Sequence, residues 1–179
     1  MEDKCFSKET AFRTLELINS WINNVDTKVS FSLAFSTTIL GLIFYNAGSE
    51  PKALQEFKIA YAEKSISFFN WSSVAILFLM YVSFLIVLIC FFLSLRGKVV
   101  NSNKGKSVFF FGTIADYSMN NYKSKVFSMN ENELEKDLTE QIHINSRICR
   151  NKFKWYNIGL SFLIISAILC VICLAFQIL

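Results

Sequence analysis

The side chains best suited to chemistry form a basic stripe near the middle of a polar segment. His143, Arg147, Arg150 and Lys154 recur at spacings of three and four residues, which places all four on one face of a helix. Guanidinium groups match the geometry of phosphate oxygens. The stripe therefore indicates contact with phosphate groups or, as the alternative, charge that faces water or anionic lipid.

Three lysines extend this candidate phosphate site. Lys152 follows Arg150 closely, and Lys104 and Lys106 lie in the loop-like, basic stretch NSNKGK at residues 101–106. The stretch is not a P-loop, because it lacks the first glycine of that motif and its Lys-Ser pair is not placed to open a helix. The candidates for contact with the phosphate groups of a ligand are thus Arg147, Arg150, Lys152, Lys104 and Lys106.

A second face of the same helix is apolar except for two amides and Lys152. Gln141 and Asn145, with Ser146 beside them, interrupt a series that includes Leu134, Leu138 and Ile148. A buried amide must find hydrogen-bond partners. These residues are therefore predicted to fix helix register, to set the number of subunits in an oligomer, or to hold a ligand.

No catalytic or metal-binding constellation is visible in the sequence. His143 is the single histidine, and the five cysteines do not have the spacing of a zinc site. Neither a paired set of carboxylates nor a nucleophile with its base stands out. We expect no enzyme, no metal and no cofactor.

The elements that must position these residues are mostly membrane helices. Of 179 residues, 53% are hydrophobic and only 18% are charged, with a mean hydropathy of +0.40. Residues 29–49, 65–95 and 155–179 contain no Asp, Glu, Lys or Arg, and each stretch is long enough for a spanning helix, which needs ~20 residues. The composition excludes a soluble globular domain and predicts an all-α membrane protein with transmembrane helices at 29–46, 70–95 and 155–179.

The distribution of lysine and arginine predicts the topology. Residues 1–28 carry four, residues 47–69 carry three, and residues 96–154 carry eleven. By the positive-inside rule, segments 1–28 and 96–154 are cytoplasmic, 47–69 is an external loop, and the chain is N-in and C-out. The chain is therefore expected to cross its membrane three times, in a multi-pass arrangement.

Helical extensions are expected on the cytoplasmic side of the first and third spans. Within residues 1–28, Leu15, Ile18, Ile22 and Val25 form an amphipathic seam that runs into the first span. The segment 96–154 is expected to end in a helix that begins near Ser128 or Asn130 and continues into the third span. Between these lies the apolar stretch FFFGTIA, where Phe111 and Gly112 are candidates for a gating or packing patch.

The first span has a face of small and hydroxyl residues. Ser30, Thr37, Thr38 and Gly41 share this face, which either lets helices approach closely or lines a narrow wet path. We regard them as pore-lining candidates. Because three helices cannot enclose a pore alone, a channel would require a symmetric homo-oligomer.

Three stretches together resemble the Pycsar transmembrane effector family. They are WINNVDTKVSFSLAFSTTILG, which includes Trp21, Asp26 and Lys28; FFFGTIA, residues 109–115; and DLTEQIHINSRICRNKFKWYNIGL, which includes Gln141, Asn145, Ser146 and Lys152. The similarity covers most of the chain. The resemblance implies a bacterial inner-membrane effector of antiphage defence that impairs the membrane when a nucleotide signal changes. In Pycsar that signal is a cyclic pyrimidine mononucleotide made by a cyclase.

The sequence departs from that pattern in lacking an appended cyclic-nucleotide-binding domain. The effector of the Hailong system has a similar build, and DNA oligomers made by a nucleotidyltransferase hold it closed. A basic, aromatic-bearing segment suits such a phosphate-rich oligomer. We therefore expect an oligomeric ion channel or pore, gated at its cytoplasmic face by a cyclic pyrimidine nucleotide or a single-stranded DNA oligomer. The alternative is a non-conducting membrane scaffold or antidote that binds a protein partner.

Overall fold

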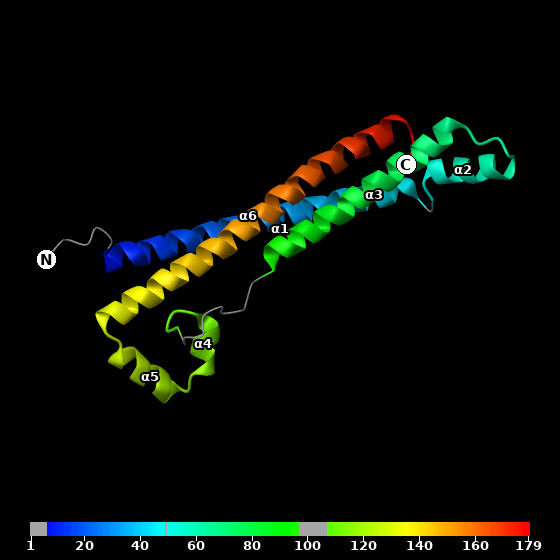
Figure 1. Cartoon of the computed structure of the whole chain (residues 1–179). Helices are drawn as coiled ribbons and strands as arrows, with labels where there is room; N and C mark the ends of the chain where they lie inside the picture. The colour runs from blue at the N-terminus through cyan, green and yellow to red at the C-terminus, as the bar shows by residue number, and fades with distance from the viewer. Residues whose placement is uncertain (1–6, 49, 97–106) are drawn as a thin grey trace. The chain divides into compact units, whose positions relative to one another are not determined.

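The computed structural model describes residues 7–48, 50–96 and 107–179, and these residues form helices with no strand among them. In chain order the helices are α1 (Lys8–Ala47), α2 (Lys52–Ala62), α3 (Phe68–Leu95), α4 (Phe111–Asp116), α5 (Met119–Ser128) and α6 (Glu131–Ala175), as labelled in Figure 1. The predicted all-α membrane protein is confirmed. The chain divides into a polar unit, residues 1–25 and 96–152, and a membrane unit, residues 26–95 and 153–179.

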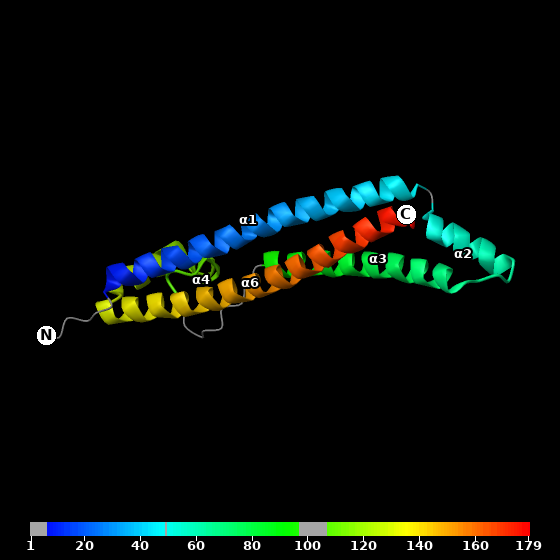
Figure 2. The ribbon, with the colours of Figure 1, turned by 90° about the horizontal axis from the view of Figure 1, so that it is seen from above.

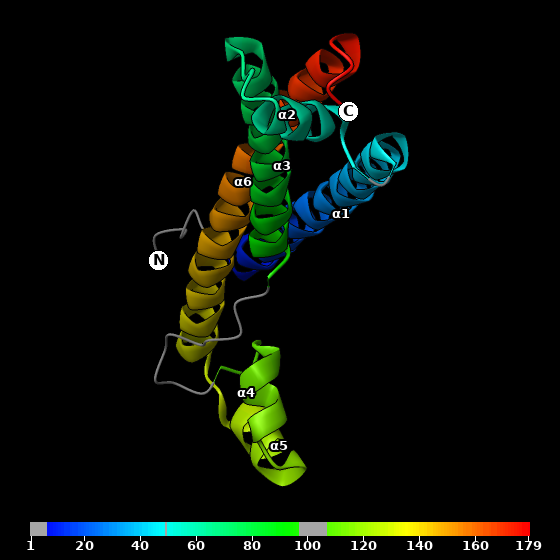
Figure 3. The same cartoon turned by 90° about the vertical axis from the view of Figure 1, so that its right-hand side faces the viewer.

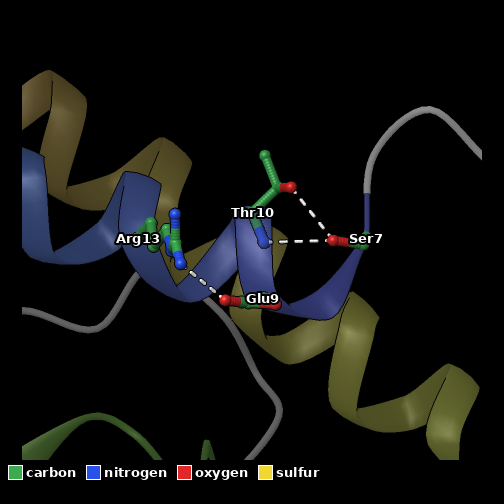
Figure 4. A network of polar contacts seen from close by, with 4 residues as sticks. All are labelled: Ser7, Glu9, Thr10 and Arg13. Atoms are coloured by element: carbon green, nitrogen blue, oxygen red, sulfur yellow. Dashed lines mark hydrogen bonds and ion pairs between the residues drawn. The ribbon is translucent and has the colours of Figure 1, made fainter.

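Both long helices are continuous, as the amphipathic seams predict. Ile18, Val25 and Val29 of α1 are buried, so the apolar seam does face the interior. Ser7 caps α1: the Thr10 amide donates to Ser7 Oγ over 3.2 Å, and Arg13 pairs with Glu9 one turn on (Figure 4). Asn130 caps α6 by accepting from the Glu133 amide at 2.9 Å.

The membrane unit contains helices that are long and apolar enough to cross a bilayer. Three such helices occur in the described residues, and their most apolar 18-residue stretches have mean hydropathies of 1.4 in α1, 3.0 in α3 and 2.8 in α6. Within this unit α6 crosses α3 and packs against it over residues 156–166 (Figures 1 and 2). Ser83 and Ser166 share a buried hydrogen bond of 2.7 Å, and the rings of Phe91 and Tyr156 stack. The contact between α3 and α6 is thus both polar and tightly packed.

Two details of the membrane unit differ from the sequence prediction. The expected external loop at 47–69 contains α2, which packs against α3 through Phe57 and Trp71 (Figure 3). Pro51 is the N-cap of this helix, and Ala53 and Ala60 are its buried residues. The sequence thus contains a proline that is typical of a helix start and a short apolar repeat that is typical of a buried helix face.

The second difference is that the last helix stops before residue 179. It ends at Ala175, where the Ile178 amide donates to the Cys173 carbonyl at 2.8 Å and Gln177 adopts a positive φ of 52°. This is a Schellman ending with a non-glycine residue at the left-handed position. The Ile178 carbonyl then accepts from the Ala53 amide at 3.1 Å. The turned end of the chain therefore satisfies a donor in the first turn of α2.

The polar unit consists of the first half of α1, helices α4 and α5, and the first half of α6. Ala11, Ile18, Val108 and Leu138 are buried in it. The ring of Phe109 meets that of Phe12 edge to face, with centroids 5.7 Å apart. Contacts of this kind hold the segment at 107–110 against α1, so part of the FFFGTIA stretch packs on a helix.

Candidate functional site

A buried polar cluster on α6 holds the segment that begins at Ser107. Asp137 Oδ2 accepts from the Val108 amide at 2.9 Å, and one helical turn later Gln141 Nε2 donates to Ser107 Oγ at 3.1 Å. The Phe109 and Phe110 amides also donate to that hydroxyl, at 3.1 and 3.2 Å. Asp137 and Gln141 are 8% and 4% exposed. The predicted amide at position 141 therefore has its partner inside the same chain.

The next amide along this face of α6 makes a contact to α1. Asn145 Nδ2 donates to Asn19 Oδ1 at 3.0 Å, on a partly exposed surface. The Ser146 hydroxyl donates back to the Ile142 carbonyl at 2.8 Å, a bond within one helix turn. Asn145 thus links α1 to α6 within the polar unit, whereas Ser146 is exposed.

The predicted phosphate contacts do not gather at one place in the described residues. Arg147 and Arg150 are exposed on α6, but Lys152 is buried, with 6% of its surface exposed. Lys104 and Lys106 lie outside the described residues. The two exposed arginines are accessible to an anionic ligand, whereas the buried lysine is engaged within the protein.

Cys149 lies one turn before Lys152 on the last polar turns of α6. Burial raises the pKa of the Cys149 thiol, and the nearby Lys152 ammonium opposes that rise. A buried thiol with a raised pKa is a poor nucleophile at neutral pH. Among the described residues there is also no group of three or more metal-ligating side chains.

The remaining candidates of the polar unit are the two residues of the apolar patch. Phe111 is exposed, and its ring lies beside that of Phe110 with centroids 4.9 Å apart. A Cβ built on Gly112 would stand 2.6 Å from the Phe110 ring. Gly112 therefore lets the start of α4 turn closely over that ring, and a larger residue would push the ring aside.

The hydroxyl face of α1 lies on the outside of the membrane unit. Ser30, Thr37, Thr38 and Gly41 are all exposed, and a Cβ on Gly41 would meet nothing within 4 Å. The hydroxyls donate to carbonyls of the preceding turn: Ser30 to Asp26 at 2.9 Å, and Thr38 to Ala34 at 2.9 Å. Their donors are satisfied, but the face itself is not covered by the other described helices of the chain.

The polar unit also contains a cavity that the sequence does not reveal. It measures about 470 Å³ and opens to solvent. Its walls come from the first turns of α1, the segment after Ser107, α5 and the start of α6. The lining comprises three rings, four aliphatic or thioether side chains and three polar side chains: Phe12, Phe109, Tyr122, Val108, Val126, Met129, Leu134, Lys8, Asn130 and Glu131.

Two polar contacts define the cavity's edges. Lys8 on α1 forms an ion pair with Glu131 on α6, and the Tyr122 hydroxyl donates to the Val108 carbonyl at 3.3 Å. Lys8 and Tyr122 lie on helices that are far apart in the sequence, so spacing alone does not connect them. Only the aromatic character of the segment and its basic flank hint at such a site in the sequence.

Two comparisons with known proteins match nearly the whole chain. The profile of the Pycsar effector protein domain matches residues 10–179. The chain is 36% identical over 178 residues to the Pycsar effector protein GmPycTM of Gulbenkiania mobilis, and the alignment covers 92% of this chain and 90% of that protein. No solved structure matches the chain significantly.

Proposed function

The chain belongs to the family of Pycsar effector proteins, and on that premise we propose that it is an oligomeric channel or pore gated by a nucleotide signal. Family membership makes it a multi-pass membrane effector of antiphage defence in the bacterial inner membrane. We propose further that the polar unit faces the cytoplasm, because it carries most of the lysine and arginine. Conduction would then impair the infected cell's membrane.

The observation that carries the channel proposal is the exposed hydroxyl face of α1. Ser30, Thr37 and Thr38 lie on the surface of the membrane unit, where a single chain would present their oxygens to lipid. Small and hydroxyl residues favour helix association in membranes, because they allow close approach and hydrogen bonding across helices. Copies of the chain that meet along this face would border a polar path. The signal is proposed to be a cyclic pyrimidine nucleotide or a single-stranded DNA oligomer from a partner enzyme.

Assembly along the α1 face predicts that Gly41→Leu weakens or abolishes the oligomer. The leucine side chain would occupy the space at which a second helix must approach. Native mass spectrometry in mild detergent should show several copies of the wild-type chain and smaller species for the variant. Gly41→Ala is the matched control and should keep the wild-type size. A wild-type monomer, or an unchanged oligomer in Gly41→Leu, would count against this interface.

The exposed arginines predict a salt-dependent contribution to ligand binding. Arg147→Gln combined with Arg150→Gln should weaken binding of a short single-stranded DNA oligomer. The log–log slope of affinity against salt should flatten by about 1.4, since each phosphate neutralised on a single strand contributes about 0.7. Fluorescence anisotropy at several salt concentrations measures this slope.

The control for the arginine pair is Lys123→Gln with Lys136→Gln, which removes two other exposed cations. It keeps the change in net charge the same and should leave the slope at the wild-type value. Equal slopes for all three proteins would exclude the arginines as phosphate contacts.

A further inference from the structure

The cavity of the polar unit has the size and lining of a small-molecule site. Its volume of about 470 Å³ falls within the ~300–1,000 Å³ typical of ligand pockets. Such pockets are mostly apolar, with a few polar groups that orient the ligand. A single nucleotide unit fits this scale, whereas an oligomer could place only one of its units inside.

Two of the rings that line the cavity are nearly perpendicular to each other, and a planar group can lie against them. The planes of Phe12 and Phe109 meet at 79°, so a base that stacks on one ring stands nearly perpendicular to the other. Edge-to-face and offset-stacked geometries are the favourable ones for aromatic groups. Tyr122 adds a third ring, which its hydrogen bond to the Val108 carbonyl holds in place. The cavity is therefore suited to a planar aromatic base.

The cation at the cavity is held by a partner that can move. The Lys8 side chain is 34% exposed, whereas that of its partner Glu131 is 77% exposed. A carboxylate so close to water can leave the ammonium at little cost, since exposed ion pairs contribute little stability. Arg13, the next cation along α1, is paired with Glu9 at 2.7 Å and does not line the cavity (Figure 4). Lys8 is therefore the cavity's own cation.

We propose that this cavity binds one nucleotide unit, with its base against Phe12, Phe109 and Tyr122 and its phosphate on Lys8 in place of Glu131. The proposal rests on the proposed function and gives its ligand a place. The unit can come from a free cyclic mononucleotide or from the end of a DNA oligomer, since both offer a planar base and an anionic phosphate. When the phosphate replaces Glu131 as the partner of Lys8, the first turn of α6 is released from α1. Ligand binding in the cavity is thereby coupled to α6, the helix that continues into the membrane unit.

Binding to the full-length protein in detergent micelles tests the site. The probes are cyclic CMP, cyclic UMP and a short single-stranded DNA oligomer, each titrated separately. Lys8→Gln should weaken binding of the recognised probe about tenfold, because the variant removes a hydrogen bond to a charged group. Phe109→Ala should weaken it by about tenfold or more, because the base has one ring fewer to stack on. The probe whose affinity falls identifies the source of the nucleotide unit.

Two matched controls separate the cavity from the rest of the polar unit. Lys123→Gln removes an exposed cation of α5, and Phe127→Ala removes an exposed ring of the same helix; neither residue lines the cavity. Both should bind like the wild type. If the cavity variants also bind like the wild type, this site is excluded while nucleotide gating stands. If no probe binds the wild-type protein, the cavity proposal and nucleotide gating both fail.

A second measurement does not depend on the folding of any variant. Irradiation of the wild-type protein with a 5-iodopyrimidine form of the bound probe should attach it to an aromatic residue that it stacks against. Peptide mass spectrometry should then place the adduct on Phe12, Phe109 or Tyr122. An adduct confined to another part of the chain would overturn the assignment.

Discussion

Gly159→Ala is expected to lower the free energy of unfolding by about 1–3 kcal/mol, the usual cost of overpacking a filled interior. A Cβ at this position would stand 2.7 Å from the ring of Phe91 and 3.1 Å from the Cβ of Cys90. The ring can shift, but the Cys90 Cβ belongs to the framework of α3, so the two helices must separate. Thermal unfolding in detergent, followed by near-UV circular dichroism, measures the loss.

The matched control for Gly159 is the same substitution at Gly41. Nothing lies within 4 Å of a Cβ there, so Gly41→Ala should be neutral or slightly stabilising, because alanine favours the helix over glycine. Phe91→Leu in the Gly159→Ala background should recover part of the loss by making room for the methyl group. Equal unfolding temperatures for Gly159→Ala and Gly41→Ala would contradict the close approach of α3 and α6.

Asp137→Ala is expected to detach the segment at 107–110 from α6. The change leaves the buried Val108 amide without its acceptor, which costs about 1–3 kcal/mol. Hydrogen exchange followed by mass spectrometry should show faster exchange in the peptide that contains Val108 and the neighbouring phenylalanines. The cavity wall at Val108 and Phe109 should loosen with it.

Two comparisons test the specificity of the Asp137 contact. Asp137→Asn keeps an oxygen acceptor and should retain most of the protection, whereas Asp116→Ala removes an exposed carboxylate of α4 and should leave it unchanged. If Asp137→Ala exchanges like the wild type, the buried bond does not hold this segment.

The membrane helices could be predicted because their signals are local. Long uncharged stretches, the seam through Ile18 and Val25, and the cap at Asn130 each depend on residues within a few turns of one another. Both long helices therefore follow from the sequence. The helix α2 was not predicted, because it is short and begins between two spans, where a polar stretch containing Pro51 is also typical of a loop.

The candidate site is harder to predict from the sequence, because the residues that contact one another there are far apart in the chain. The sequence marks Gln141 as an amide that needs a partner, but nothing in its own helix points to Ser107, to which it donates. The cavity likewise unites Lys8 and Phe12 of α1 with Tyr122 of α5. Periodicity shows which face of a helix is buried, but not which segment covers it. Tertiary structure was needed to bring these side chains together.

Ion flux from liposomes that contain the purified protein tests the nucleotide-gated channel directly, because one assay measures both conduction and its control by a nucleotide. We expect flux that cyclic CMP or cyclic UMP switches on, or flux in the free protein that a short single-stranded DNA oligomer switches off. Gly41→Leu should conduct less under either regime. Liposomes that stay sealed under every condition, with the protein inserted, would contradict the channel and favour a non-conducting role.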